Sequence, residues 1–253
     1  MVAPLTGTIA IVTGASSGIG RATAQRLAVE GATVAVVARR ADRLVVLVDD
    51  IRKAGGTAFA VETDITDRNQ AEKAVQTVVD TYGRLDILVN NAGLMILGPF
   101  AEANVDDFER MIDVNQKGLL YLTKAALSHL TEAVSDSPRG VADIVNISSI
   151  AGREAWGNFG AYAMTKFGVN GFTEALRQEI TQRHVRVGVI EPGAVDTELQ
   201  SHNTAEVQEK YAAFPADKQP LGPEDIADAV AYMTTRPAHA SISEMWVMPT
   251  DQV

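Results

Sequence analysis

Short runs of apolar, often β-branched residues alternate along this chain with longer stretches in which apolar positions recur every three to four residues. The first pattern predicts buried strands and the second predicts amphipathic helices. The predicted strands are residues 8–13, 33–38, 57–61, 85–89, 142–148, 185–190 and 244–248. The predicted helices are residues 18–30, 41–54, 67–82, 106–130, 160–182 and 223–235. This alternation predicts an α/β fold, in which a doubly wound parallel sheet of seven strands, like that of Rossmann proteins, is covered by helices on both faces.

Two stretches interrupt the alternation. Residues 135–140, Ser-Asp-Ser-Pro-Arg-Gly, predict a surface turn before the fifth strand. Residues 194–222 lie between the sixth strand and the last long helix, and they predict an added helical excursion. Ligands of open α/β sheets bind beyond the carboxyl ends of the strands, so we expect this excursion to cover a site. Without a linker or a repeat, residues 1–253 are predicted to form a single domain.

Composition narrows the class of protein. The chain has no cysteine, which excludes disulfides, thiolate catalysis and cysteine-based metal sites, and its four histidines lack ligand spacing, so no metal is predicted. A net charge of −10 argues against nucleic acid as a partner. No apolar run approaches the ~20 residues of a membrane span, and the first residues carry no basic, signal-like segment. We therefore expect a soluble, cytoplasmic protein.

The first predicted strand leads into a glycine-rich loop and a helix. The sequence from Ile9 to Gly20 is Ile-Ala-Ile-Val-Thr-Gly-Ala-Ser-Ser-Gly-Ile-Gly, which spaces Gly14, Gly18 and Gly20 as G-x-x-x-G-x-G. Glycine lets the backbone turn sharply and approach a pyrophosphate, while the helix N-terminus supplies N–H donors and the positive end of its dipole. The hydroxyls of residues 16 and 17 add donors. The loop predicts a dinucleotide site.

Tyr162 and Lys166 are four residues apart, so on a helix they share one face. A phenol has a pKa of about 10, and an ammonium beside it lowers that pKa toward the range that a general acid or base needs. Ser149 stands thirteen residues before Tyr162 at the end of an apolar run, with Ser148 as an alternative. Asn115 falls on the apolar stripe of the helix 106–130, where a buried amide without partners costs about 1–3 kcal/mol.

These motifs, together with Asn90-Asn-Ala-Gly93 after the fourth strand, resemble the short-chain dehydrogenase/reductase family over nearly the whole chain, in the family's order and spacing. The resemblance implies hydride transfer from NADPH to a carbonyl carbon. Tyr162 would then donate a proton to the carbonyl oxygen, and Ser149 would give that oxygen a second hydrogen bond. Lys166 would lower the pKa of Tyr162 and bind the nicotinamide ribose. Asn115 would hold a water that links Lys166 to solvent, or else only fix the packing of the core.

The end of the second strand decides between NAD and NADP. Ala38 stands where an NAD enzyme usually has a carboxylate, and Arg39 and Arg40 follow it. A guanidinium can bind a 2′-phosphate bidentately, so we predict NADP, with Arg39 as the main contact and Arg40 as a weaker candidate. The alternative is that both are solvated residues at a helix start. Ser17 also departs from the pattern, because many NADP-binding members have a basic residue there.

The resemblance implies further contacts with the cofactor. Asp64 would meet the adenine, Asn91 would meet the adenine ribose region, and Pro192-Gly193 with Thr197 would close over the nicotinamide. The alternatives are loop caps for the first two and a simple strand-ending turn for the third. The full set predicted to bind the cofactor is Gly14, Ser16, Ser17, Gly18, Ile19, Gly20, Arg39, Arg40, Asp64, Ile65, Asn91, Ala92, Gly93, Tyr162, Lys166, Pro192, Gly193, Val195 and Thr197.

Within the family, residues 90–95, 148–153, 166–169 and 249–252 are most similar to NADP-dependent carbonyl reductases of the clavaldehyde dehydrogenase and serine 3-dehydrogenase types. This resemblance implies reversible reduction of a ketone or aldehyde to an alcohol. One alternative is a catalytically silent NADP-binding regulator, and another is an epimerase or dehydratase that uses the same residues. The tail lacks the V-D-G-G type finish of many relatives, which are therefore a poor guide to substrate or C-terminal contacts.

The substrate pocket is predicted between the loop 91–97, the loop after Ser149 and the excursion. Mostly apolar walls favour a medium-sized hydrophobic or aromatic carbonyl compound. The predicted substrate contacts are Ser149, Leu94, Met95, Trp156, Tyr162 and Leu199. The helix 160–182 carries more small and apolar positions than one sheet-facing stripe requires. Together with the family resemblance, this predicts a homotetramer built on the helices 160–182 and 106–130.

Overall fold

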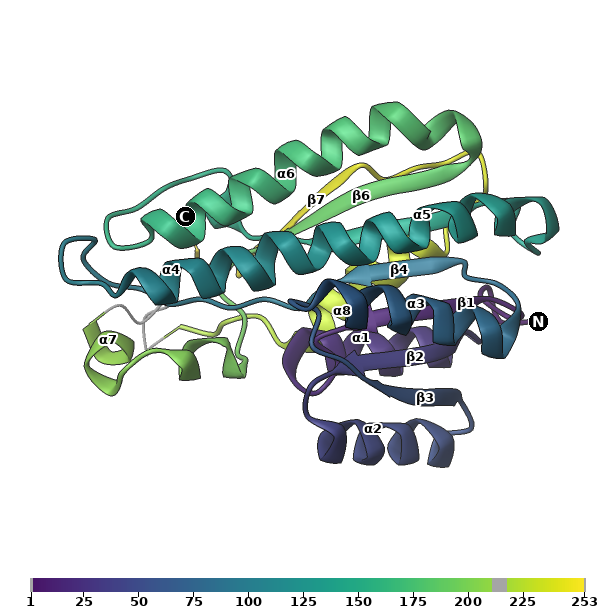
Figure 1. Cartoon of the computed structure of the whole chain (residues 1–253), viewed down its shortest axis with the longest axis horizontal. Helices are drawn as coiled ribbons and strands as arrows, with labels where there is room; N and C mark the ends of the chain where they lie inside the picture. Colours follow the sequence, from purple (N-terminus) through teal and green to yellow (C-terminus); the bar gives the residue numbers. More distant parts are fainter. Residues whose placement is uncertain (1, 211–217, 253) are drawn as a thin grey trace.

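The computed structural model describes residues 2–210 and 218–252, and in it seven strands form one parallel sheet in the order β3-β2-β1-β4-β5-β6-β7 (Figure 1). The strands are β1 (Ile9–Thr13), β2 (Thr33–Ala38), β3 (Thr57–Glu62), β4 (Ile87–Asn90), β5 (Ala142–Ile147), β6 (Val185–Pro192) and β7 (Glu244–Val247). Each strand overlaps a predicted one. The order reverses between β1 and β4, as in a doubly wound sheet, so the predicted fold class is confirmed.

Helices cover both faces of the sheet. On one face lie α1 (Gly18–Val29), α2 (Ala41–Lys53) and α8 (Pro223–Thr234), whose apolar residues share a core with Ala10 and Val12 of β1. On the other lie α3 (Arg68–Tyr82), α5 (Leu119–Asp136) and α6 (Gly160–Ile180), which pack with Ile9 and Ile11. Successive residues of β1 thus point into opposite cores, which explains why Ile9 to Val12 are all apolar.

The predicted helix 106–130 is in fact three helical segments in series. It begins as α4 (Val105–Ile112), widens to a π-helical segment (Asp113–Gly118) and continues as α5. The predicted end at residue 130 was too early, because Leu130 and Ala133 are both buried and extend the apolar stripe. The surface turn predicted at residues 135–140 is correspondingly shorter, because α5 continues to Asp136. Within this turn the Gly140 N–H donates to the Ser137 carbonyl at 3.1 Å.

The excursion leaves the sheet after β6 and returns to its own starting point. The Asp196 N–H donates to the Leu221 carbonyl at 2.9 Å, and the Leu221 N–H donates to the Ala194 carbonyl at 3.0 Å. Between these ends the chain forms a 3₁₀ helix (Glu198–His202) and α7 (Ala205–Lys210), which Figure 1 shows beside the carboxyl ends of the strands. The predicted excursion is therefore present, although residues 211–217 of it lie outside the described residues.

Two further 3₁₀ segments complete the chain, Ile150–Gly152 after β5 and Thr181–Arg183 after α6. On the outside of α5 and α6, the large apolar side chains Leu120, Met164 and Phe167 are exposed. These are the helices for which subunit contacts were predicted, and the homotetramer stays a prediction. Within the described ranges, no helix is both long and apolar enough to cross a membrane.

Candidate active site

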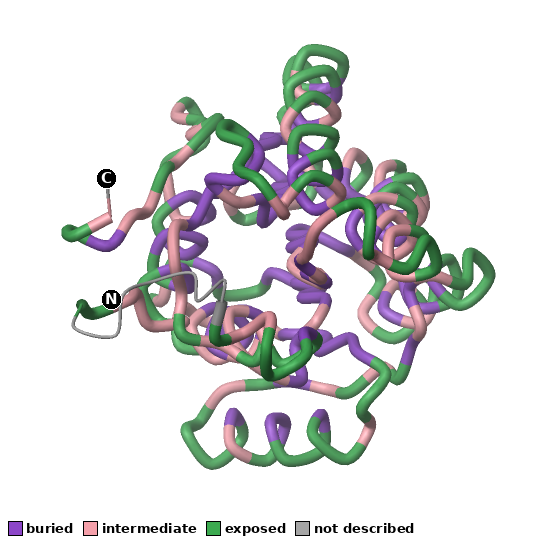
Figure 2. The backbone as a smooth tube through the Cα atoms, turned by 90° about the vertical axis from the view of Figure 1, so that its left-hand side faces the viewer, coloured by how far each residue is buried: buried purple, intermediate pink, exposed green. Residues whose placement is uncertain are grey.

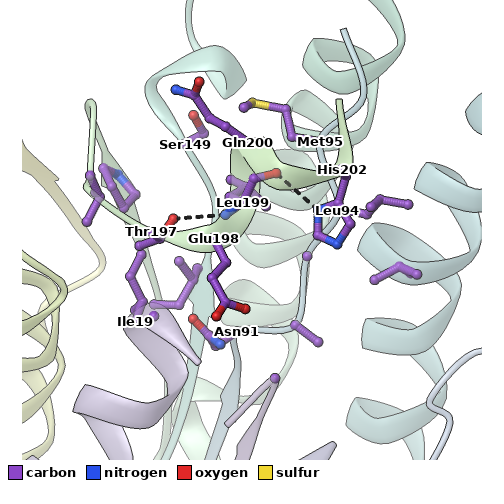
Figure 3. Close-up of a pocket in the computed structure, with 18 of the residues that line it drawn as sticks. Ile19, Asn91, Leu94, Met95, Ser149, Thr197, Glu198, Leu199, Gln200 and His202 are labelled. Atoms are coloured by element: carbon purple, nitrogen blue, oxygen red, sulfur yellow. Dashed lines mark hydrogen bonds between the residues drawn. The ribbon is translucent and has the colours of Figure 1, made fainter. Parts of the chain in front are cut away.

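A cavity of about 960 Å³ lies at the carboxyl ends of the strands. Segments that follow β1 to β6 contribute to its walls, together with the excursion; Figure 2 views the molecule from this side and Figure 3 shows the lining in close-up. All of the predicted site residues line this cavity except Gly20 and Asn115. The fold thus brings together side chains from positions 14 to 199 of the sequence.

The glycine loop forms one end of the cavity. Gly14 has a φ of +66° and Gly18 a φ of +51°, which is left-handed backbone that strains other residues. A side chain at Gly14 would also meet the Cα of Ala92 at 2.8 Å, so the two loops touch through their backbones. Ser17 precedes α1 without capping it through its side chain. The loop therefore has an uncapped helix N-terminus that can receive an anion.

Thr13 holds the glycine loop against the segment after β4. Its buried hydroxyl accepts hydrogen bonds from the backbone N–H groups of Asn91 and Ala92, both at 3.0 Å. The Asn91 amide in turn donates to the Thr13 carbonyl at 2.8 Å. The sequence analysis did not single out this threonine. Its signal is positional, since a hydroxyl ends β1 where the parallel neighbour β4 also ends.

The two arginines after β2 differ in their contacts. The Arg40 guanidinium donates to the hydroxyls of Ser16 and Ser17 at 2.8 and 2.7 Å, and it also pairs with Glu198 of the excursion at 3.0 Å. Arg39 is exposed and lines the same cavity. Among the described residues its guanidinium has no hydrogen-bond or ion-pair partner, so it is available to a ligand.

Two other predicted cofactor contacts already have partners within the protein. The Asp64 carboxylate accepts from the N–H and the hydroxyl of Thr66 at 3.0 and 2.8 Å, which is the geometry of a loop cap. Gly193 lies against the C-terminal segment, where Gln252 accepts a hydrogen bond from the Ala194 N–H at 2.8 Å. The Asp64 contacts match the loop-cap alternative, while both residues still line the cavity.

The two serines after β5 point in different directions. The Ser148 hydroxyl donates to the Lys166 carbonyl at 3.3 Å and so turns toward the backbone of α6. Ser149 accepts a hydrogen bond from the Ala151 N–H at 3.1 Å and shares a side-chain hydrogen bond with Tyr162. Of the two, only Ser149 is paired with the phenol.

Tyr162 and Lys166 lie on the inner face of α6, and each is only 5% exposed. The Lys166 ammonium lies 5.7 Å from the centre of the Tyr162 ring and donates to the Ile147 carbonyl at 2.9 Å. Burial raises the pKa of Tyr162 to about 12, and the hydrogen bond from Ser149 opposes this only in part. In the protein alone the pKa of Tyr162 is thus raised, whereas the sequence predicted a lowered value, because desolvation is the largest influence on this phenol.

Burial also lowers the pKa of Lys166, to about 8. Both shifts have the same cause, since a low-dielectric surrounding disfavours the charged form of either group. At neutral pH, Tyr162 is thus fully protonated and Lys166 is mostly an ammonium.

Asn115 lies in the π-helical segment, outside the cavity wall. Its side-chain oxygen accepts from the Leu94 N–H at 2.7 Å, and its amide donates to the Leu94 carbonyl at 2.9 Å and to the Thr165 hydroxyl at 3.0 Å. The Thr165 hydroxyl donates to the carbonyl of Tyr162 at 2.7 Å. Asn115 therefore ties the loop after β4 to the turn of α6 that carries Tyr162, and π-helical segments are frequent at functional sites.

The other end of the cavity is apolar. Leu94, Met95 and Tyr162 belong to one buried cluster, against which Phe159 and Leu199 pack. Trp156 lies edge-on to Phe159 with 5.7 Å between ring centres, and it is 41% exposed. Figure 3 shows Leu94, Met95 and Leu199 around this end, with Ser149 and Gln200 on its upper side.

Asn203, which the sequence analysis missed, fixes the excursion over the apolar end. Its side-chain oxygen accepts from the Leu97 N–H at 2.7 Å, and its amide donates to the Met95 carbonyl at 3.1 Å. A lone asparagine in an irregular stretch gives no sequence signal for such a contact, which joins residues more than a hundred positions apart.

Comparison with known proteins agrees with this geometry. The family model for short chain dehydrogenases matches residues 8–208. The chain belongs to the short-chain dehydrogenase/reductase family. It is therefore an oxidoreductase, as predicted from the motifs.

Individual relatives of this oxidoreductase include both sequences and structures. Glycine betaine reductase ATRR of Emericella nidulans is 39% identical over 250 residues, which are 98% of this chain but only 19% of that protein, so the chain spans about a fifth of its length. The closed form of a serine dehydrogenase complexed with NADP+ is 33% identical, with a TM-score of 0.87 over 97% of this chain and 96% of the other. A metagenomic short-chain oxidoreductase in complex with NADP is 32% identical, with a TM-score of 0.82 over 98% and 99% of the chains.

The lowered pKa of Lys166 leads to a prediction for the stability of this protein. Because the folded pKa lies below that of an unfolded lysine, the fold holds a buried ammonium at a cost below pH 8, and this cost falls as the pH rises toward 10. Lys166→Met should therefore raise the free energy of unfolding at pH 7 by roughly 1–3 kcal/mol. It should also abolish the rise in stability between pH 8 and 10.

Urea denaturation at pH 7, 8, 9 and 10 measures both effects. Lys124→Met, on the exposed side of α5, is the control and should leave the pH dependence of the wild type unchanged. A Lys166→Met variant that is less stable than the wild type at pH 7 would contradict the assignment of a desolvated ammonium.

Proposed function

We propose that this protein is an NADPH-dependent reductase that converts a ketone or aldehyde into an alcohol, and that can run in reverse. The observation that carries the proposal is the group formed by Ser149 and the buried pair Tyr162 and Lys166, which lines the same cavity as the glycine loop and Arg39. A proton donor and a dinucleotide cradle in one cavity are what carbonyl reduction requires.

The residues at one end of the cavity fit a dinucleotide phosphate. Gly14 and Gly18 have left-handed backbone that leaves room beside the uncapped N-terminus of α1, and Arg39 and Arg40 add two cations. A carboxylate at position 38 would repel a 2′-phosphate, whereas alanine does not. The complexes of two relatives with NADP support the same choice of cofactor. When bound, NADPH would supply the hydride.

The chain itself would supply the proton and hold the substrate. A carbonyl oxygen between Tyr162 and Ser149 would accept hydrogen bonds from both hydroxyls, and these bonds strengthen as negative charge develops on the oxygen. Tyr162 would then transfer its proton to that oxygen, so that the hydride and the proton together give the neutral alcohol. A pKa of about 12 keeps Tyr162 protonated, which suits reduction at neutral pH. The ammonium of Lys166 would stabilise the phenolate that is left.

The alternatives use the same fold. A catalytically silent NADP sensor would not need a proton donor in the cavity. The presence of Tyr162 as a donor, close to both Ser149 and Lys166, therefore favours an enzyme. An epimerase or dehydratase would use the same residues, and no observed contact favours either reaction over reduction. The apolar cluster around Leu94 and Met95 supports a hydrophobic or aromatic carbonyl substrate.

The first prediction from this function concerns the cofactor. NADPH should be preferred over NADH by at least tenfold in kcat/KM, because a charge-assisted contact with the 2′-phosphate contributes roughly 1.5–3 kcal/mol. Arg39→Ala should raise KM for NADPH and leave KM for NADH nearly unchanged. Steady-state kinetics with a panel of carbonyl compounds would measure both, and equal use of the two cofactors by the wild type would contradict the proposed phosphate contact.

The second prediction separates a catalyst from a sensor. Tyr162→Phe should retain NADPH binding, measured by fluorescence titration, and lose nearly all turnover, because only the proton donor is removed. More than a few per cent of residual turnover would refute the role of Tyr162. Tyr121→Phe, at a half-buried position of α5 that does not line the cavity, is the matched control and should keep full activity.

The third prediction concerns the apolar end of the cavity. Trp156→Ala should shift kcat/KM toward bulkier ketones without changing affinity for NADPH, because Trp156 lines the substrate end and does not touch the glycine loop. A panel of aromatic ketones of increasing size would measure the shift. If small charged carbonyl compounds outperform aromatic ketones in the wild type, the pocket assignment fails while the reductase proposal stands.

A further inference from the structure

The 3₁₀ helix of the excursion carries one acidic side chain that reaches across the cavity. The carboxylate of Glu198 pairs with Arg40 at 3.0 Å and with Arg43 of α2 at 2.7 Å. Figure 3 shows Glu198 and Gln200 leaving this helix on opposite sides, Glu198 on the side of Ile19 and Gln200 on the side of Ser149. The excursion therefore contacts the arginines at the cofactor end of the cavity through Glu198.

Arg40 is held in place by more than this ion pair. Its guanidinium also donates to the hydroxyls of Ser16 and Ser17, so it stays beside the glycine loop whether or not Glu198 is bound. The glycine loop thus already orients the Arg40 guanidinium, and Glu198 occupies a place beside it where an anion can bind. Hydrogen bonds from Arg43 and then Arg40 lower the pKa of Glu198, so the carboxylate is ionised at neutral pH.

We propose that Glu198 is a specificity-determining residue whose carboxylate competes with the 2′-phosphate of the cofactor for Arg40. This inference rests on the proposed use of NADP. A 2′-phosphate bound by Arg39 and Arg40 must either displace Glu198 from Arg40 or bear the repulsion of a second anion, and both cost affinity. A ligand without the phosphate leaves the ion pairs intact and incurs neither cost. Glu198 therefore reduces the preference for NADP over NAD that the arginines alone would give.

Solvent exposure limits the size of the effect. The side chains of Arg40, Arg43 and Glu198 are 42%, 43% and 48% exposed, so water and salt screen their charges. We expect a change of about three- to fivefold in affinity at low ionic strength, which is the range of exposed charge pairs. The change should shrink in high salt.

The test uses two ligands that differ only in the 2′-phosphate, adenosine 2′,5′-bisphosphate and adenosine 5′-monophosphate. Isothermal titration of the full-length protein should show that Glu198→Gln binds the bisphosphate about three- to fivefold more tightly than the wild type does. Affinity for the monophosphate should not change. Glu72→Gln is the matched control, because Glu72 is 47% exposed, pairs with Arg68 on α3 and lies away from the cavity.

Three results would overturn the inference. Unchanged or weaker binding of the bisphosphate to Glu198→Gln would show that Glu198 does not compete, or that it orients the arginines for the phosphate. An equal gain in affinity for both ligands would show that Glu198 only keeps the excursion in place over the cavity and does not compete with the phosphate. If the wild type does not distinguish the two ligands at all, the proposed choice of NADP fails together with this inference.

Discussion

Burial of Tyr162 and Lys166 in a single cavity is the constraint on which the rest of the site depends. Desolvation favours the neutral form of both groups, so the cavity keeps the phenol protonated and makes the ammonium costly. Burying these two groups lowers the free energy of unfolding, so apolar packing elsewhere must compensate. Two apolar cores on opposite faces of the sheet provide this packing. Stability and chemistry therefore oppose each other at these two residues.

Hydrogen bonds between segments fix the geometry around this pair. Asn115 joins the backbone of Leu94 to Thr165, and Thr165 in turn bonds to the carbonyl of Tyr162. At the other end of the cavity, Thr13 joins the glycine loop to the segment after β4. Both links end on the loop 91–94, which thereby lies in a fixed position between the cofactor end and the catalytic pair. The π-helical segment is the local deformation that accompanies the position of Asn115.

The sequence predicted those features that depend on local pattern. Strands buried on both faces appear as unbroken apolar runs, and the left-handed turns at Gly14 and Gly18 appear as glycines, so both were found. The roles of Thr13 and Asn203 were not found, because each makes its contact with a segment that only the folded sheet brings near. The shift in the pKa of Tyr162 was predicted in the wrong direction for a related reason. Spacing reveals a neighbouring charge, but it does not reveal the degree of burial, and burial is the larger effect.

Polar contacts attach the excursion at both ends of the cavity. Asn203 attaches it to Met95 and Leu97 at the substrate end, and Glu198 attaches it to Arg40 and Arg43 at the cofactor end. The two attachments differ in kind. The Asn203 bonds are buried and bind uncharged backbone groups, so a charged ligand does not compete for them. The Glu198 ion pairs are half exposed and use cations that an anionic ligand also seeks, so they are the attachment that can exchange. A single segment is thus attached by buried, uncharged hydrogen bonds where the substrate would bind, and by exposed ion pairs, open to competition from an anionic ligand, where the cofactor would bind.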